Sequence, residues 1–197
     1  MALRDRLGRH RPEGTEEAAH LAAILTFVAA HEDPFDRTIP HAHLTASAFV
    51  LSWDGSRVLL LHHRKLGRWL QPGGHAESGE ADGEHVALRE AHEETGIADL
   101  RLHPDAPRPL DVDVHSIPAR GSERAHLHLD LRYAVMAPMT AVLLRSAKEA
   151  SALRWFGWDE LDGLGLDGGL RRGLDKARRF FPPARTLLSR HGTGGAA

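Results

Sequence analysis

Residues 73–97 read GGHAESGEADGEHVALREAHEETGI, a glycine-rich turn that leads into a short acidic helix. The two glycines at the start of this stretch can adopt backbone angles that other residues rarely take. Gly96 stands where the C-cap of the helix is expected. Between the turn and this cap the helix carries three carboxylates, Glu90, Glu93 and Glu94. The rest of the chain is interpreted around this turn and helix.

The three carboxylates crowd one side of the helix. At about 100° per residue they fall within about 100° of one another. Like charges three or four residues apart destabilise a helix by a few tenths of a kcal/mol each, so a favourable partner is expected. A hard divalent cation prefers carboxylate and carbonyl oxygens, and the carbonyl groups of Gly73 and Gly74 are close in sequence. Arg89 is a second partner, and a solvated charged helix face is the alternative.

The order of these residues resembles the signature of the Nudix hydrolases, a Gly, a Glu, then Arg-Glu-aliphatic-x-Glu-Glu-x-Gly-aliphatic. The match runs from Gly74 to Ile97, but eight residues separate Glu80 from Arg89, one more than the family signature has. The extra residue leaves the role of Glu80 open. Because Gly83 disfavours a helix interior by about 1 kcal/mol relative to Ala, we expect the extra residue to precede the helix, with Asp82 as its cap.

The resemblance implies an α/β protein with a Nudix fold, a mixed β-sheet sandwiched between α-helices (α/β/α). We expect a helical N-terminal extension over residues 1–36, the Nudix domain over residues 37–190 and a disordered tail over residues 191–197. The implied reaction is metal-dependent hydrolysis of a diphosphate linkage in a nucleoside diphosphate linked to another moiety X, with Mg²⁺ or Mn²⁺ and with water as the nucleophile.

Two alternatives share this fold. A non-catalytic, nucleotide-binding regulatory domain usually has a damaged acidic motif, whereas all three carboxylates are present here. Isopentenyl-diphosphate isomerase relies on a catalytic cysteine, and this chain has no cysteine. A turnover assay with Mg²⁺ separates an enzyme from a binding module.

The resemblance also implies roles for individual residues of the motif. We expect Glu90 and Glu94 to be the principal metal ligands and Gly74 to be a ligand through its backbone carbonyl. Glu93 is expected to be a ligand or the base that orients water. Arg89 is expected to brace the carboxylates rather than touch the substrate, so that the catalytic group comprises Arg89, Glu90 and Glu93.

Other candidate residues lie outside the motif. Glu149, before Leu153, lies in a segment that resembles the late part of Nudix domains, where a further Glu approaches the metal; an ordinary surface Glu is the alternative. The basic segment after residue 63 predicts phosphate contacts by Arg64 and Arg68, or else a solvated loop. His126 and His128 lie on one face of an alternating strand, which either meets solvent or lines the substrate cleft. A metal site made of these two histidines is a weaker alternative.

The remaining periodicity predicts strands and helices around the motif. Asp54-Gly55 predicts a hairpin between two β-rich runs. The expected strands are residues 44–53, 57–63, 99–103, 110–117 and 126–136. The expected helices are residues 15–31, 158–161 and 170–181, with Thr15 as the N-cap of the first and Pro182 ending the last. The apolar stripe of the first helix packs either on its own domain or on a second copy of the chain, which leaves a homodimer open.

Composition limits the classes of binding partner expected for this chain. The chain has 197 residues, 42% of them hydrophobic, which is enough for one sizeable core. A net charge of −2 supplies no broad positive surface, so we expect neither nucleic acid nor a membrane as a partner. The absence of cysteine excludes disulfides, and the charged N-terminus does not resemble a signal peptide. We expect a cytoplasmic enzyme that acts on a small nucleotide-type molecule.

Overall fold

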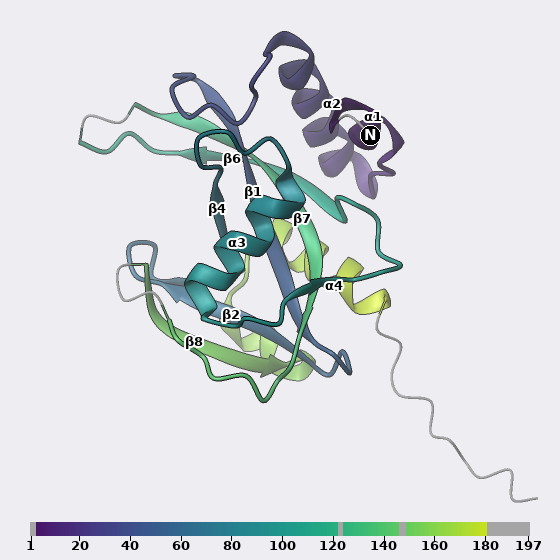
Figure 1. Ribbon diagram of the computed structural model, residues 1–197, viewed down its shortest axis with the longest axis vertical. Coiled ribbons are helices and arrows are strands. Elements are labelled where there is room, and N and C mark those ends of the chain that lie inside the picture. The colour runs from purple at the N-terminus through teal and green to yellow at the C-terminus, as the bar shows by residue number, and fades with distance from the viewer. Residues whose placement is uncertain (1–2, 122–123, 146–148, 181–197) are drawn as a thin grey trace, which may run out of the picture.

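The computed structural model describes residues 3–121, 124–145 and 149–180 (Figure 1). In these ranges eight strands form one mixed, curled sheet. The strands are β1 (Ala42–Ser52), β2 (Arg57–His63), β3 (Arg68–Leu70), β4 (Gly73–His75), β5 (Arg101–Leu102), β6 (Asp111–Ile117), β7 (His126–Ala137) and β8 (Ala150–Gly157). β1 pairs with β7 in parallel along its whole length, and the other pairings are antiparallel: β1 with β2 and β4, β7 with β5 and β6, and β2 with β3 and β8.

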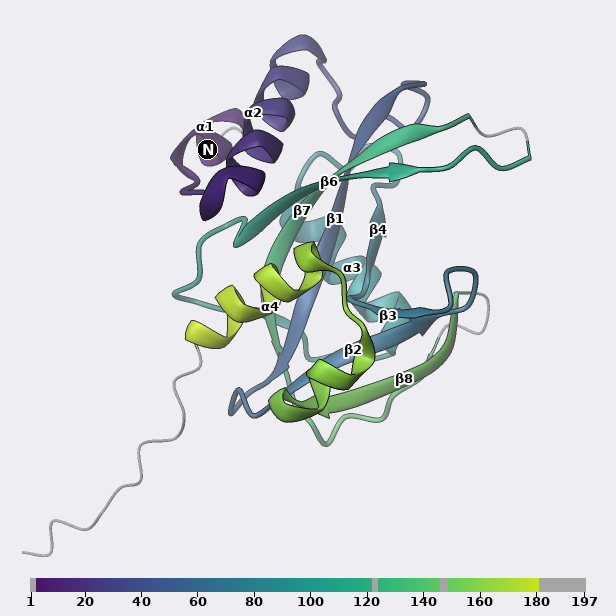
Figure 2. The ribbon, with the colours of Figure 1, turned by 180° about the vertical axis from the view of Figure 1, so that it is seen from behind.

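Helices cover both faces of this sheet. α3 (Gly83–Thr95) crosses one face, and α4 (Gly168–Arg179) covers the other, as the two opposite views show (Figures 1 and 2). α1 (Leu3–Arg9) and α2 (Gly14–Ala30) pack together near β6, and the 3-10 helix η1 (Trp158–Leu164) follows β8. The expected α/β/α sandwich with a helical N-terminal extension is confirmed. No helix in the described part of the chain is long and apolar enough to cross a membrane.

The central strand β1 is buried along its whole length because side chains of opposite faces meet different helices. Ala48 and Val50 pack with Ala91 of α3. Phe49 packs with Leu174 of α4, and a Cβ on Gly173 would lie only 2.0 Å from the Phe49 ring. Small residues at these positions let α3 and α4 approach the sheet closely.

The acidic helix begins and ends as its sequence predicts. The side chain of Asp82 caps it by accepting a hydrogen bond from the backbone N–H of Glu84, and Gly96 ends it in the left-handed conformation at φ 72°. Because the helix starts at Gly83, the extra residue of the motif lies before it. This expectation is confirmed.

The N-terminal helix α2 packs on the chain's own sheet. Its buried residues Leu21, Ile24 and Phe27 join a core cluster with Val112 of β6 and Leu129 of β7. The expectation of Thr15 as N-cap is wrong, since α2 starts at Gly14 and its N-cap residue is Glu13, whose side chain makes no capping hydrogen bond. The sequence analysis also missed α1, which Leu7 anchors in the same core.

Other expected boundaries differ in detail. The hairpin of β1 and β2 and the strands β6 and β7 lie where the periodicity placed them, whereas β5 is shorter than residues 99–103. The short strands β3 and β4 and the long strand β8 were not predicted. The expected stop at Pro182 and the expected tail lie outside the described residues.

Candidate active site

The glycine turn brings β4 against the acidic helix. The backbone N–H of Gly73 donates a hydrogen bond of 2.9 Å to the carboxylate of Glu94. At Gly74 a Cβ would lie 2.7 Å from the carboxyl carbon of Glu90 and 2.8 Å from one of its oxygens. Only a residue without a side chain leaves room for the carboxylate at this point. The two glycines therefore serve close approach as well as the turn.

Burial and neighbouring acids shift the titration of this helix. Glu94 is only 5% exposed, and burial, together with the charges of Glu149 and Glu90, raises its pKa to about 8 despite the N–H of Gly73. Burial also raises the pKa of Glu90, and Glu93 and Glu149 add to this shift while Arg89 opposes it. We call Glu90, Glu94 and Glu149 the acidic cluster. Its carboxylates are held together at a free-energy cost that a bound cation would remove.

Glu149 thus lies at the acidic cluster, although it comes from the other end of the domain. It precedes β8, and its backbone carbonyl accepts a hydrogen bond of 2.8 Å from the N–H of Arg64. The loop that carries Arg64 is therefore beside the cluster. The side chains of Glu149 and Arg64 are exposed. The side chain of Arg68 is exposed as well, and its guanidinium lies 3.6 Å from the Asp167 carboxylate.

Arg89 links the parts of the motif through a set of hydrogen bonds. Its guanidinium donates to both carboxylate oxygens of Glu80, the shortest of these bonds being 3.0 Å, and to the carbonyl of His75 at 2.7 Å. It also contacts Glu90 and Glu93, each at 3.2 Å. These partners, led by Glu80, raise the pKa of Arg89. Glu80 keeps its contact with Arg89 despite the extra residue, and this geometry fits a bracing role for Arg89.

Glu93 differs from the other two acids of the helix. Its side chain is 51% exposed, and its carboxylate accepts a hydrogen bond from Arg89. The expected face of three carboxylates is therefore divided, with Glu94 buried, Glu90 half-buried and Glu93 open to water. An exposed carboxylate beside buried ones is placed to exchange protons with solvent.

The polar face of β7 does not meet solvent. His126, Asp130 and Arg132 are buried, and His128 is half-buried. The interpretation of this face as solvated is wrong. Arg132 is held by three carboxylates, which belong to Asp111, Asp113 and Asp130.

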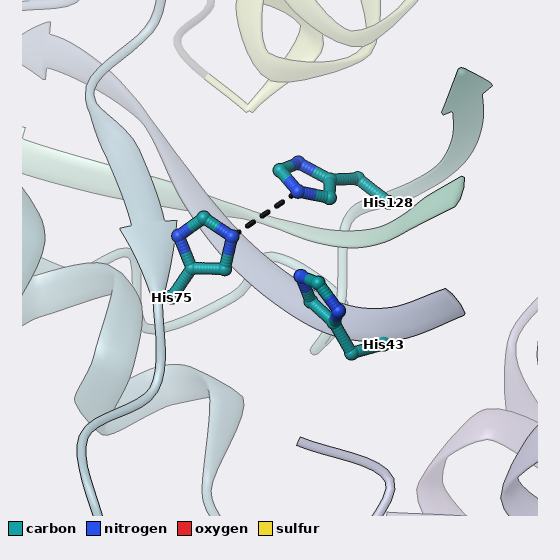
Figure 3. A group of neighbouring side chains, drawn as sticks. All are labelled: His43, His75 and His128. Atoms are coloured by element: carbon teal, nitrogen blue, oxygen red, sulfur yellow. Dashed lines mark hydrogen bonds between the residues drawn. The ribbon is translucent and has the colours of Figure 1, made fainter. Parts of the chain in front are cut away.

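This part of the sheet also holds two groups of side chains, neither of which the sequence predicted as a group. The first, here the histidine cluster, comprises His43 of β1, His75 of β4 and His128 of β7 (Figure 3). Burial, Arg37 and neighbouring histidines lower the pKa of His75 to about 3, and burial and neighbouring histidines lower that of His128 to about 2. Of these three residues, only His128 was a predicted site residue, and the predicted alternative of a metal site had paired it with His126.

The second group, here the ion network, joins α2, the sheet and α4. Its acids are Glu17, Asp111, Asp113 and Asp130, and its bases are His10, Arg132, Arg172 and Lys176. Alternation along β7 was the only signal of this network. It did not identify the ion pairs, since Glu17 and Lys176 are 159 positions apart in the chain.

Comparisons with known proteins agree with the fold described above. The family model described as "NUDIX domain" matches residues 41–179. No curated protein matches the chain in sequence. Among solved structures, the chain is similar to a Caenorhabditis elegans Ap4A hydrolase in a binary complex, at 19% identity and a TM-score of 0.53 over 70% of this chain and 96% of that one.

Two further structures are similar in fold. The Escherichia coli dihydroneopterin triphosphate pyrophosphohydrolase has 19% identity and a TM-score of 0.55, over 68% of this chain and 92% of that one. The NUDIX domain of Shewanella oneidensis NrtR, complexed with ADP ribose, has 16% identity and a TM-score of 0.50, over 78% of this chain and 96% of that one. At these identities the structures show the fold, whereas the family model covers most of the chain. The chain therefore belongs to the Nudix family.

Proposed function

We propose that this enzyme hydrolyses a diphosphate linkage in a nucleoside diphosphate linked to another moiety X, and that it uses Mg²⁺ or Mn²⁺. One observation carries the proposal: Glu94 is buried beside two other carboxylates, so that its pKa is raised to about 8. A divalent cation would reverse this shift, because it favours the charged form of each carboxylate.

The donor set fits a hard cation. Glu90 and Glu94 would supply carboxylate oxygens, Gly74 its backbone carbonyl and Glu149 a further carboxylate. When bound, such an ion neutralises phosphate charge and lowers the pKa of a bound water. The fit also requires close packing of glycine and carboxylate, which the approach of Gly74 to Glu90 provides.

The chain's own residues would position the reactants and move protons. Arg89, held by Glu80 and the His75 carbonyl, fixes the carboxylates of Glu90 and Glu93. The Glu93 carboxylate is half-exposed and held by Arg89, so it is placed to accept a proton from the attacking water. Arg64 and Arg68, both exposed, would bind the outer phosphate oxygens in pairs of hydrogen bonds.

The substrate class follows from the same chemistry. The similar proteins act on Ap4A, act on dihydroneopterin triphosphate or bind ADP ribose, which all contain phosphoanhydride bonds. We therefore propose a small nucleotide-type substrate, met in the cytoplasm, and no nucleic-acid partner. Because the apolar stripe of α2 packs on its own sheet, the sequence argument for a homodimer no longer applies.

The test is a panel of nucleoside di- and triphosphates, nucleotide sugars, dinucleotides and coenzyme A, assayed with Mg²⁺. On the best substrate, Glu94→Gln and Glu90→Gln should each lower kcat by roughly 10²- to 10⁴-fold, since each removes a charge that the reaction needs. Glu84→Gln is the matched control, because Glu84 lies on the same helix but pairs with Arg6 and Arg108.

Two results would contradict the proposal. Normal hydrolysis by both variants would exclude these carboxylates as the catalytic centre. Nucleotide binding without turnover on any substrate would instead identify a regulatory binding domain.

A further inference from the structure

Three imidazole rings converge on one face of the sheet. Each residue of the histidine cluster offers a ring nitrogen, and these three atoms lie within 4.8 Å of one another. The Nε2 atoms of His75 and His128 are 3.1 Å apart, and the ring of His43 lies 5.0 Å from each of the other two rings (Figure 3). The rings come from three different strands and turn toward a common point.

Strand pairing fixes this convergence. The parallel pairing of β1 with β7 places His43 opposite His128. The antiparallel pairing of β1 with β4 places His75 opposite Thr45, two residues from His43 and therefore on the same face. The backbone of His75 is held further by the hydrogen bond from Arg89 to its carbonyl. The ligand positions are thus set by the sheet rather than by mobile loops.

Three imidazoles suit a different kind of ion from the one that suits the acidic cluster. Nitrogen ligands favour zinc and its neighbours among the divalent transition metals, whereas Mg²⁺ prefers oxygen. Around a tetrahedral Zn²⁺ with Zn–N distances of about 2.0–2.1 Å, ligand nitrogens lie roughly 3.3 Å apart. The separation of 3.1 Å between His75 and His128 is already close to this value, and the ligand nitrogen of His43 lies within 4.8 Å of the other two.

We propose that His43, His75 and His128 bind a divalent transition-metal ion of the zinc class. Three protein ligands leave a fourth position for water or for an oxygen of the substrate, the arrangement typical of open zinc sites.

This site is separate from the acidic cluster. The Cβ direction of Gly74 points at the Glu90 carboxylate, and the next side chain along a strand points to the opposite face. The side chain of His75 therefore leaves β4 away from Glu90. The two sites share one strand and have different ligands, so each is testable without the other.

Co²⁺ is the probe, because tetrahedral Co²⁺ has intense visible absorption bands that octahedral Co²⁺ lacks. The full-length, tag-free protein is stripped of metal and titrated with Co²⁺. We expect one tightly bound equivalent with tetrahedral bands, which Zn²⁺ displaces. His128→Asn, and separately His43→Gln, should weaken this equivalent by about 100-fold or more. His85→Asn is the matched control, since the His85 side chain is 71% exposed, and it should bind as the parent does.

One further variant and a check of folding keep the outcome interpretable. Glu94→Gln should keep the full Co²⁺ spectrum, so that a failure of the proposed hydrolysis and a failure of this site are distinguishable. Because His43 is buried and its variant is at risk of misfolding, the half-buried His128 is the decisive position, with circular dichroism verifying its fold. A parent without a tight equivalent, a folded His128→Asn that binds like the parent, or a Glu94→Gln that loses the bands would each overturn the proposal.

Discussion

The acidic cluster and the ion network both bury carboxylates, but they balance the charge in opposite ways. Glu94 is 5% exposed, and its pKa is raised to about 8. Glu17 is fully buried, and burial alone would raise its pKa too, but hydrogen bonds from His10, from the Glu13 backbone and from Lys176 lower it to about 2. Burial acts in the same direction at both sites, so the difference comes from the partners.

The ion network supplies its own cations. Lys176 contacts both Glu17 and Asp111, and Arg172 reaches Asp111 at 2.9 Å and Asp113 at 3.2 Å. In the acidic cluster, the groups that act on Glu94 are one backbone N–H and two further acids. The ion network thus contains the cations that balance its carboxylates, whereas Glu94 in the acidic cluster has no such partner in the described part of the chain. This difference makes the acidic cluster the site at which a bound cation is expected.

The largest effect is expected from removing the central cation of the ion network. Lys176→Met leaves the buried acids Glu17 and Asp111 without their shared partner. Loss of one member of a buried pair costs about 3–5 kcal/mol of unfolding free energy. Arg171→Met on the same helix is the control, since its partner Asp162 is 82% exposed, and it should cost at most about 1 kcal/mol. Urea unfolding of both variants gives the comparison, and equal losses would show that the network is not specially stabilising.

A pH series tests the contribution of Glu17 to the same network. Because the folded pKa of Glu17 is about 2 and its ordinary value is 4.5, its contribution is complete above pH 4.5 and is lost as the pH falls from 4.5 toward 2. The difference corresponds to roughly 3 kcal/mol. Unfolding free energies of the parent should fall more steeply over this window than those of Glu17→Gln. Parallel curves for the two proteins would contradict the lowered pKa.

Gly74→Ala tests close approach at the acidic cluster. The added Cβ would meet the Glu90 carboxylate, which is the movable end of a flexible side chain, so stability should change little. The carboxylate itself must move, and we expect kcat to fall by about 10- to 100-fold. Ala substitution at Gly163, which has open space around it and no positive φ, is a control for the stability cost of an added Cβ. Full activity of Gly74→Ala would show that the position of Glu90 is not critical.

The smallest effect is expected from Glu90→Gln in metal-free buffer. The substitution relieves repulsion by Glu93 and Glu149, so the variant should be as stable as the parent or more stable by tenths of a kcal/mol. Added Mg²⁺ should raise the Tm of the parent and raise that of the variant less, since the ion stabilises the state that binds it. The measurement is a set of thermal melts with and without Mg²⁺. A clear loss of stability without metal would show that the charge of Glu90 is already balanced by groups of the protein itself, as that of Glu17 is.

The parts of the site that the sequence predicted are those made by short-range contacts. Asp82 caps α3 and Gly96 ends it through neighbours a few residues away, and the grouping of Glu90 with Glu94 follows from helical spacing. Each of these features depends on local backbone geometry. Such geometry is readable from spacing alone.

The parts that the sequence did not predict, the histidine cluster and the ion network, depend on the register of strands that are distant in the chain. His43 meets His128 only because β1 pairs in parallel with β7, and Asp111 meets Arg132 through the pairing of β6 with β7. A shift of one residue in either pairing would send these side chains to the other face. Periodicity located β7 and its polar face but gave no register. The interpretation of that face as solvated failed for the same reason, since its partners come from the neighbouring strands β1, β4 and β6.

The ion pair between Glu17 and Lys176 also predicts an order of folding events during synthesis. The two residues are 159 positions apart, and β1 to β8 all lie between them in the chain. While a ribosome is still translating the region before α4, Glu17 lacks the lysine that balances it. We therefore expect α2 to dock fully only after α4 has emerged, so that the beginning of the chain is among the last parts to settle into place.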